Sequence, residues 1–382
     1  MGPVVEFWSS VELGAFGRAL LRALGELGIS ARQRFAVDHD QYRRAGGRLG
    51  RARLRWRSYV AYPFSLQARL RQQPLPDAIV VCTNTFYAPA VAEHAAMDRG
   101  VPVVHWIFDL FPDVLGAGAA LGGQGLARAT LARLTRWTFD HAAANVFLGT
   151  ALRAYAEGRY GPIPRAVVIP VGADGEGFRA AEPHSRGAGQ PLRVLYCGNF
   201  GRMHDTQTVV DLLRGENDPR WTMEFRGHGA GFRRVQSSLP RSRAGVHFGG
   251  SLGDTEWREA MMAADIALVT LKDGAEGLVM PSKTYSAMVA GQAILAVCPA
   301  TSELAETVRR YDAGWVVEPG HSDELAAVLA EAAARPDEVL RRRRNAFRAG
   351  HAHYVHTAVA EPWAKLLVDV IADASAARAV PS

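Results

Sequence analysis

Short runs of aliphatic residues alternate with amphipathic stretches along most of the chain. The runs are typical of buried strands, and the stretches carry apolar residues three or four positions apart, which is typical of helices. Strands are expected at 4–7, 78–82, 101–107, 144–148, 166–169, 193–197, 221–226, 246–248, 266–270, 293–297 and 314–317. Helices are expected near 20–27, 88–99, 126–141, 204–214, 254–263, 283–290, 302–311, 322–334 and 358–375. Strands alternating with helices predict an α/β protein with parallel sheets.

The chain is too long for one ordinary core, since it has 382 residues. A segment rich in Pro, Gly and Ser separates two α/β halves, which predicts two Rossmann-like domains. The expected division is an N-terminal domain at 1–182, a linker at 183–191, a C-terminal domain at 192–357 and a last helix, 358–382, that could return to the N-terminal domain.

Composition narrows the class of protein. Hydrophobic residues make up 48% and charged residues 21%, which is typical of a globular protein. Three widely spaced cysteines predict reduced thiols and a cytoplasmic location. We expect no membrane-spanning helix and no signal peptide, because no apolar run is long enough and no basic N-terminal region is present. Since no histidine pair has metal-ligand spacing, no metal is assigned.

A glycine loop opens the second half of the chain. In VLYCGNFGRMHD, 194–205, an apolar run leads into Gly198, Asn199 and Gly201, and a helical pattern follows. This arrangement presents backbone N–H groups to a phosphate, and Arg202 adds a fixed cation. Taken alone, the loop fits an ordinary strand-to-helix turn equally well.

Two further segments of the second half have features of a ligand site. In EGLVMPSKTYSAMVAG, Pro281 and Ser282 are good helix-start residues, and Lys283 falls in the first turn. A lysine there opposes the helix dipole, so a bound anion would explain it, although a solvated lysine is the alternative. In GHGAG, after Arg226, Gly227 and Gly229 leave room for a ligand; a flexible loop is the alternative.

A carboxylate ends one strand of the first half. In WIFDLFPD, 106–113, Asp109 stands among aromatic residues, where it could hold sugar hydroxyls or transfer a proton. Helix capping before Pro112 is the alternative.

An arginine-rich stretch has no acidic neighbour. Nine arginines and no acid lie between Gln41 and Pro76, and seven of the arginines fall within 43–57. Tyr59, Tyr62 and Phe64 follow the densest part. We favour an anionic membrane surface as the partner of 43–57 over nucleic acid, because no nucleic-acid motif accompanies it. A solvated, partly disordered loop is the alternative.

In order along the chain, these motifs resemble glycosyltransferase family 4, which has the GT-B fold. The likeness is best to bacterial members that build cell-surface polysaccharides. It rests on WIFDLFPDVL, VLYCGNFGRMHDTQTVVDLL, HFGGSLGDTEWREAMMAADIALVTL, VMPSKTYSAMVAGQAILAV and SELAETV. The resemblance implies two Rossmann-like domains with parallel sheets facing across a cleft.

The resemblance also implies retaining, metal-independent and cofactor-free transfer of a sugar from a nucleotide-sugar donor to a hydroxyl acceptor. The acceptor could be a lipid-linked glycan, a polysaccharide or a small molecule. Roles follow by position. Gly201, Arg202 and Lys283 would hold the diphosphate, and the segments around Arg226, Gly227, Gly229, Ser251 and Leu252 would frame the base. Amides of Gly277, Leu278 and Val279 would face the sugar or phosphates, Asp109 the transferred sugar, and Gly14 the reacting centre. The other expected donor-binding residues are Gly198, Asn199, Pro281 and Ser282.

Three positions depart from the family pattern. Ser286 stands where many members have a ribose-binding glutamate, Thr208 where a second basic residue is expected, and Phe108 where His or Arg precedes the aspartate. They keep alternatives open. A non-catalytic nucleotide-sugar-binding protein, a nucleotide-sugar epimerase and a phosphorylase remain candidates beside a transferase that is cytoplasmic or peripheral on the inner membrane.

Overall fold

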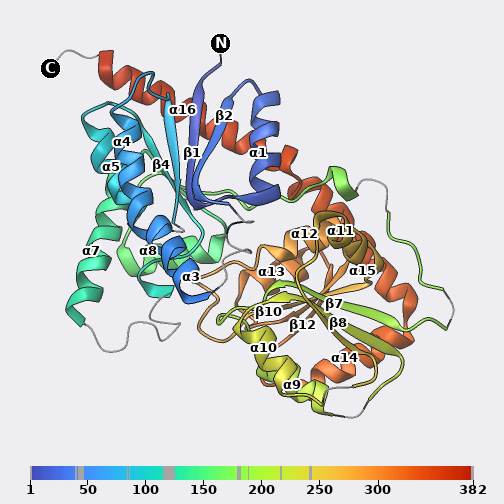
Figure 1. The fold of residues 1–382 in the computed structure, drawn as a ribbon. Helices are drawn as coiled ribbons and strands as arrows, with labels where there is room; N and C mark the ends of the chain where they lie inside the picture. The colour runs from blue at the N-terminus through green and yellow to red at the C-terminus, as the bar shows by residue number, and fades with distance from the viewer. Residues whose placement is uncertain are drawn as a thin grey trace. The chain divides into compact units, whose positions relative to one another are not determined.

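The computed structural model describes residues 2–38, 41, 47–83, 85, 87–114, 125–178, 182–187, 189–215, 217–240 and 243–379. The chain forms two compact units (Figure 1). Unit 1 comprises Met1–Pro170 and His356–Ser382, and unit 2 comprises Val171–Val355.

Unit 1 is built on a six-stranded parallel sheet of order β2-β1-β3-β4-β5-β6. Its strands are β1 (Val4–Val11), β2 (Ser30–Val37), β3 (Ala78–Cys82), β4 (Val103–Ile107), β5 (Ala144–Phe147) and β6 (Ala166–Val168). Its helical segments are α1 (Gly14–Glu26), α3 (Gly47–Trp56), the π-helical turn η1 (Arg57–Ala61), α4 (Tyr62–Leu70), α5 (Ala88–Met97), α7 (Gly125–His141), α8 (Thr150–Tyr160) and α16 (His356–Ala379). Every residue of β3, β4 and β5 is buried, as expected for strands covered on both faces.

Strand β2 was not predicted from the sequence. It lies at the edge of the sheet beside β1, and most of its residues are at least partly exposed. Its sequence, SARQRFAV, includes Arg32 and Arg34. An edge strand needs no continuous apolar run, so the pattern that marks the other strands is missing here.

The C-terminal helix α16 packs within unit 1, along α1 (Figure 1). Its Trp363 is fully buried. The indole ring makes edge contacts with Phe7 of β1 at 5.8 Å and with Trp106 of β4 at 5.0 Å between ring centroids. These contacts anchor the end of the chain to the first sheet, although most of the sequence separates Trp363 from both partners.

Unit 2 has a second six-stranded parallel sheet, of order β12-β11-β10-β7-β8-β9. Its strands are β7 (Leu192–Asn199), β8 (Trp221–His228), β9 (Val246–Gly249), β10 (Ile266–Thr270), β11 (Ala293–Val297) and β12 (Gly314–Val317). Its helices are the short 3₁₀ helix η2 (Glu176–Phe178), α9 (Gln207–Arg214), α10 (Ala230–Ser237), α11 (Asp254–Ala263), α12 (Lys283–Val289), α13 (Glu303–Arg310), α14 (Ser322–Ala334) and α15 (Pro336–His353).

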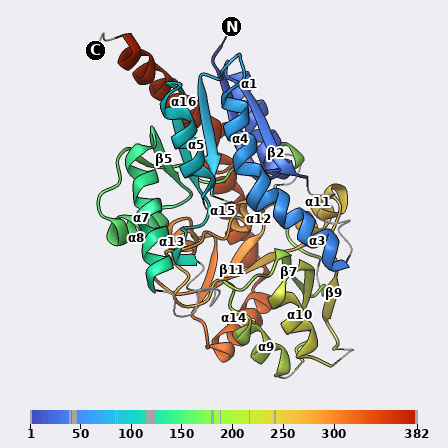
Figure 2. The same cartoon turned by 60° about the vertical axis from the view of Figure 1, so that its left-hand side comes forward.

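The strand order of unit 2 defines where a ligand can enter. The chain builds outward from β7 to β8 and β9, and then continues on the other side of β7 with β10, β11 and β12. This is the Rossmann order, with its switch point between β7 and β10. Helices α9, α10 and α14 pack together beside β8 (Figure 2). Ligands of such sheets bind at the carboxyl ends of the strands next to the switch point.

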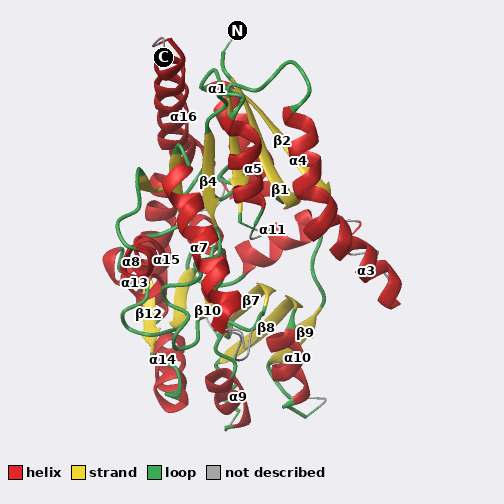
Figure 3. Ribbon diagram, turned by 90° about the vertical axis from the view of Figure 1, so that its left-hand side faces the viewer, coloured by secondary structure: helices red, strands yellow, loops and turns green. Residues whose placement is uncertain are grey.

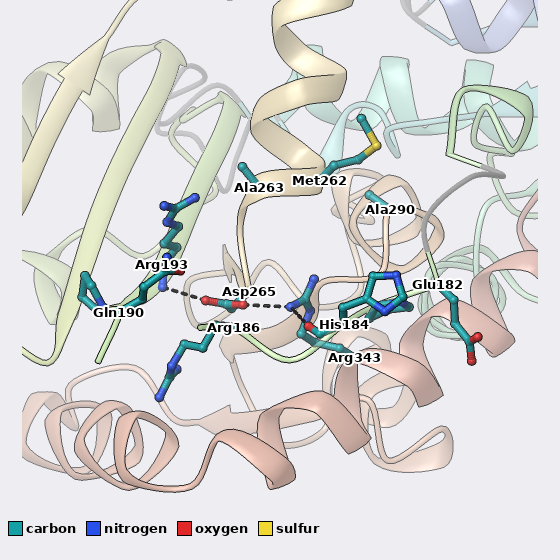
Figure 4. A pocket seen from close by; sticks show the side chains of 12 residues that line it. Glu182, His184, Arg186, Gln190, Arg193, Met262, Ala263, Asp265, Ala290 and Arg343 are labelled. Atoms are coloured by element: carbon teal, nitrogen blue, oxygen red, sulfur yellow. Dashed lines mark hydrogen bonds and ion pairs between the residues drawn. The ribbon is translucent and has the colours of Figure 1, made fainter. Parts of the chain in front are cut away.

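The division of the chain differs from the predicted one, since it falls between Pro170 and Val171 and not within 183–191. The described part of the predicted linker is packed on unit 2. Arg343 donates through Nη1 to the His184 carbonyl at 3.2 Å and to Asp265 Oδ1 at 2.8 Å. Figure 4 shows Asp265 between that guanidinium and the backbone amide of Arg193, 3.0 Å from Oδ2. The cavity there, about 210 Å³, lies at the amino ends of β7 and β10 and is therefore not at the ligand edge of the sheet.

The three cysteines, Cys82, Cys197 and Cys298, are unpaired thiols. Within the described residues, no helix combines the length and the apolar character needed to cross a bilayer.

Candidate active site

Lys283 reaches across the switch point of unit 2. It is the first residue of α12, and its Nζ donates to the Tyr196 hydroxyl at 2.5 Å and to the Asn199 carbonyl at 3.3 Å. The ammonium also lies 4.1 Å from the centroid of the Tyr196 ring. Burial lowers the pKa of Lys283 to about 7. The half-buried lysine is thus only partly charged near neutral pH, and an anion bound beside it would favour its charged form.

The neighbouring His204 is neutral. Its Nδ1 lies 2.6 Å from the Thr270 carbonyl at the end of β10. Burial, and then the nearby Lys283, lower the pKa of His204 to about 3. The positive charge at this edge therefore comes from lysine and arginine side chains.

Two of the predicted glycines are required by close approach of the backbone. A β-carbon at Gly227 would lie 2.0 Å from the Gly198 carbonyl oxygen, and one at Gly229 would lie 2.3 Å from the Phe200 carbonyl oxygen. Both glycines also have positive φ, of 138° and 120°. These glycines thus allow the ends of β7 and β8 to lie close together. The alternative interpretation of the segment as a flexible loop does not fit these tight backbone contacts.

A cavity of about 350 Å³ adjoins the loop after β7 and is rich in cations. Gly201 and Arg202 line it as predicted residues, together with Arg234 of α10 and Lys272, which follows β10. Arg234 Nη2 donates to Gln207 Oε1 at 2.6 Å. Sequence reasoning missed Arg234 and Lys272. The available signal was that Lys272 follows a predicted strand, at the same edge of the sheet as the glycine loop.

The segments predicted to frame the base come together at the ends of β8 and β9. Arg226 pairs with Glu224 at 2.5 Å, and its guanidinium occupies the space that a side chain at Gly249 would need. Ser251 Oγ lies 3.1 Å from His228 Nδ1. Leu252 follows in the same turn and is half-buried.

Two of the three backbone amides at 277–279 make local hydrogen bonds. The Leu278 and Val279 amides donate to the Ala275 carbonyl, at 3.1 and 3.3 Å, and so are engaged within a local turn. Pro281 O accepts from both the amide and the hydroxyl of Thr284. Ser282 stands at the N-cap of α12 without a side-chain capping bond. Of the three predicted amides, only that of Gly277 has no such local bond among the described contacts.

The departures at Ser286 and Thr208 have different structural meanings. Ser286 lines a cavity of about 80 Å³ together with Lys283 and Cys197, so it stays near the site. Thr208 is fully buried, and its hydroxyl accepts from the Gly320 amide at 2.7 Å. Thr208 therefore holds the α9–α14 packing and does not face the cation-rich cavity.

Asp109 and Gly14 belong to unit 1, at the carboxyl ends of β4 and β1. The amides of Phe108 and Asp109 both donate to Thr83 Oγ1, at 3.0 and 3.2 Å. Phe108 packs on Trp106 and Phe16, and burial raises the pKa of the Asp109 carboxyl to about 6. Asp113, in contrast, accepts from Tyr160 and Arg159, so it is a structural anchor.

Two domain families match the chain. The glycosyl transferase 4-like domain matches residues 14–172, and the glycosyl transferases group 1 family matches residues 191–335. A curated relative, the probable glycosyltransferase WbjE of Pseudomonas aeruginosa, is 27% identical over 238 residues, 59% of this chain. The chain spans 58% of the length of that relative.

Solved structures share the fold over nearly the whole chain. A sucrose-phosphate synthase from Thermosynechococcus elongatus has a TM-score of 0.73 at 18% identity, covering 97% of this chain and 100% of its own. Anabaena HepE in complex with UDP-glucose has a TM-score of 0.69 at 15% identity, covering 96% and 100%. WaaG, a glycosyltransferase involved in lipopolysaccharide biosynthesis, has a TM-score of 0.65 at 17% identity, covering 95% and 99%.

Two Rossmann-like units with six-stranded parallel sheets, together with these neighbours, define a protein of the GT-B fold. The chain belongs to the glycosyltransferases that resemble family 4. The fold class and the family expected from the motifs are confirmed.

Proposed function

We propose that this protein transfers a sugar from a nucleotide-diphosphate donor to a hydroxyl acceptor in polysaccharide or glycoconjugate biosynthesis, with retention of anomeric configuration and without a metal. The observation that carries the proposal is that Lys283 contacts the Asn199 carbonyl at the start of the glycine loop after β7, and that the same loop continues into Gly201 and Arg202, which line the cation-rich cavity. A diphosphate there would receive both a positive charge and backbone donors. HepE, which shares the fold, has been solved with UDP-glucose, which supports a nucleotide-sugar donor.

Thr208 cannot act as the second basic residue that the family pattern has at its position. Arg234 and Lys272 are the proposed substitutes for it. Both line the cavity that contains Arg202, whereas Thr208 is buried under the loop that holds Gly320. Metal-free transfer needs protein cations to balance the leaving diphosphate, and this cavity offers three of them beside the one carboxylate of Asp205.

Asp109 is the proposed group of unit 1 that acts on the transferred sugar. It stands just after β4, where the backbone amides of Phe108 and Asp109 donate to Thr83 Oγ1 and the Phe108 ring packs on Trp106, and it is partly buried. A carboxylate in such surroundings can stabilise positive charge that develops on the sugar in the transition state.

The experiment begins with a thermal-shift screen against UDP-, GDP-, ADP- and TDP-sugars, starting with UDP-glucose. A donor at about 100 times its Kd adds roughly 2.7 kcal/mol of stability, which raises Tm visibly. The donor that shifts Tm is then incubated with candidate acceptors, and the anomeric configuration of the product is read by NMR. A product with inverted configuration contradicts retention, and a rate abolished by EDTA contradicts metal independence.

Single substitutions distinguish the loss of a contact in the cation-rich cavity from the general effect of removing a positive charge. Arg234→Ala and Lys272→Ala should each weaken donor binding about ten- to a hundredfold, since a charge-assisted contact contributes about 1.5–3 kcal/mol. Lys365→Ala removes an exposed lysine of α16 and serves as the matched control. Donor binding with no transfer or hydrolysis under any condition would favour the non-catalytic alternative.

A further inference from the structure

The segment 47–70 of unit 1 is one helical run with two faces. It consists of α3, the π-helical turn η1 and α4, and Figure 3 shows α3 extending away from the first sheet. One face is buried and contacts the core through side chains four positions apart: Leu54, Ser58, Tyr62, Leu66 and Leu70. A four-residue period exceeds the 3.6 residues of an α-helical turn, so such a stripe would spiral around the helix.

The π-helical turn keeps this face toward the core. Its hydrogen bonds reach one residue further than those of an α-helix, which takes up part of the excess. The Ser58 carbonyl within the turn accepts from Thr85 Oγ1 at 2.9 Å. Arg57 ties the same turn to the Ala36 carbonyl of β2. The run is therefore firmly placed on unit 1.

The opposite face is apolar and exposed. Its residues follow one another at spacings of seven, four and four, and they have exposed fractions of 88% for Leu49, 59% for Trp56, 41% for Val60 and 64% for Phe64. All eight tryptophans lie among the residues that the structure describes, and of these only Trp56 is classed as exposed. A soluble helix normally turns such side chains inward, so this stripe needs a partner.

Arginines accompany the stripe. Arg51, Arg53 and Arg55 are exposed on α3, and no acidic residue occurs between Gln41 and Pro76 to neutralise them. An amphipathic helix with bulky apolar side chains on one face and arginines around it is the kind that lies in the headgroup region of a bilayer. Nucleic acid would use the arginines but would leave the apolar stripe in water.

We propose that the outer face of segment 47–64 docks unit 1 reversibly on an anionic lipid bilayer. Leu49, Trp56, Val60 and Phe64 enter the interface, while Arg51, Arg53 and Arg55 contact lipid phosphates. This surface contains no residue of the proposed donor site, so it can be tested independently of transfer activity.

The first test is co-sedimentation of the full chain with vesicles. Binding is expected with phosphatidylcholine vesicles that contain phosphatidylglycerol, and it should weaken at high salt because exposed charges are screened. Equal recovery with neutral and anionic vesicles overturns the proposal. So does tight binding to a DNA or RNA oligonucleotide without binding to vesicles.

Two sets of variants examine the two parts of the surface. Arg51→Ser/Arg53→Ser/Arg55→Ser should lower the partition constant roughly a hundredfold, since each basic residue contributes about fivefold near an anionic surface. Leu49→Ser/Trp56→Ser/Phe64→Ser should lower it by at least tenfold. Each set has a matched control elsewhere on the chain. Equal positive charge is removed by Arg99→Ser/Arg133→Ser/Arg348→Ser, and exposed apolar side chains are removed by Leu27→Ser/Met97→Ser/Val368→Ser. A control that lowers binding as much as its partner set overturns the proposal.

Insertion is measured directly with brominated lipids, which quench tryptophan only at bilayer depth. Quenching is expected in the unmodified chain and should disappear in Trp56→Phe while co-sedimentation persists. Quenching that survives in Trp56→Phe would place another part of the chain in the bilayer and contradict the assignment.

Discussion

The carboxyl edges of the two sheets use opposite chemistry on closely related frames. At the edge of unit 2, glycines draw the backbone of β7 and β8 together and Lys283 reaches the Asn199 carbonyl. At the edge of unit 1, the carboxylate of Asp109 follows β4 among Trp106 and Phe108. One edge is built of backbone donors and cations, and the other of a carboxylate among aromatic rings.

Burial acts in opposite directions at the two edges. It lowers the pKa of Lys283 to about 7 and raises the pKa of Asp109 to about 6, because burial always favours the neutral form. Each group therefore changes its charge close to neutral pH. The comparison indicates that one edge is suited to holding an anion and the other to acting on developing positive charge.

The largest effect is expected at the edge of unit 1. Asp109→Asn keeps the shape and removes the charge, so kcat should fall about a hundred- to a thousandfold while donor Kd changes little. Steady-state kinetics and donor titration measure the two separately, with the exposed Asp98→Asn as control. Loss of donor affinity with normal kcat would make Asp109 a binding residue and break the comparison.

At the edge of unit 2, Lys283→Ala and Arg202→Ala should each lower kcat/KM ten- to a hundredfold. Each removes one cation from a doubly charged diphosphate, and a charge-assisted contact contributes about 1.5–3 kcal/mol. Lys365→Ala should leave kcat/KM unchanged. Normal kinetics in both Lys283→Ala and Arg202→Ala would refute the proposed diphosphate site.

The acid limb of the pH profile should depend on the edge of unit 1, and the alkaline limb on the edge of unit 2. Below about pH 6, Asp109 takes up a proton and kcat should fall about tenfold per unit. Above about pH 7, free Lys283 loses its proton, so donor binding requires proton uptake and affinity should fall by about the same factor per unit. Asp109→Asn should abolish the acid limb only, and Lys283→Arg the alkaline limb only. An alkaline limb that persists in Lys283→Arg would assign it to another group.

The smallest effect is expected from Thr208→Val. The Gly320 amide would lose its acceptor, which should lower the free energy of unfolding by about 1 kcal/mol. Urea denaturation measures this change, and donor Kd should be unaltered. A higher donor Kd in Thr208→Val would indicate that Thr208 takes part in donor binding.

Much of the fold could be predicted from local pattern. The strands β3, β10 and β11 are buried on both faces, so each is a continuous apolar run, and the helices α11 and α14 have the predicted bounds. Strand β2 was missed because an exposed edge needs no such run. The helical run 47–70 was missed because it is apolar on two faces, which hides the one-sided pattern of an ordinary helix.

The candidate site was predictable to the extent that it rests on local sequence. The glycine loop and the lysine at the start of α12 can be recognised from neighbouring residues alone. Arg234 could not, because it lines the cavity only through the packing of α10 beside the loop, and Lys272 was indicated only by its position directly after a predicted strand. The amides of Leu278 and Val279 were assigned to a ligand, but a local turn engages them.

The sequence by itself determined the alternation of strands and helices, the glycines that a close backbone approach requires, and residue types that suit an anion. Only the tertiary structure decided which of these residues meet. Lys283 contacts Asn199 and Tyr196 across separations of 84 and 87 residues, and Thr208 meets Gly320 across 112. Such contacts depend on the order of strands in the sheet and on the packing of helices against it, which local hydrophobic patterns do not encode.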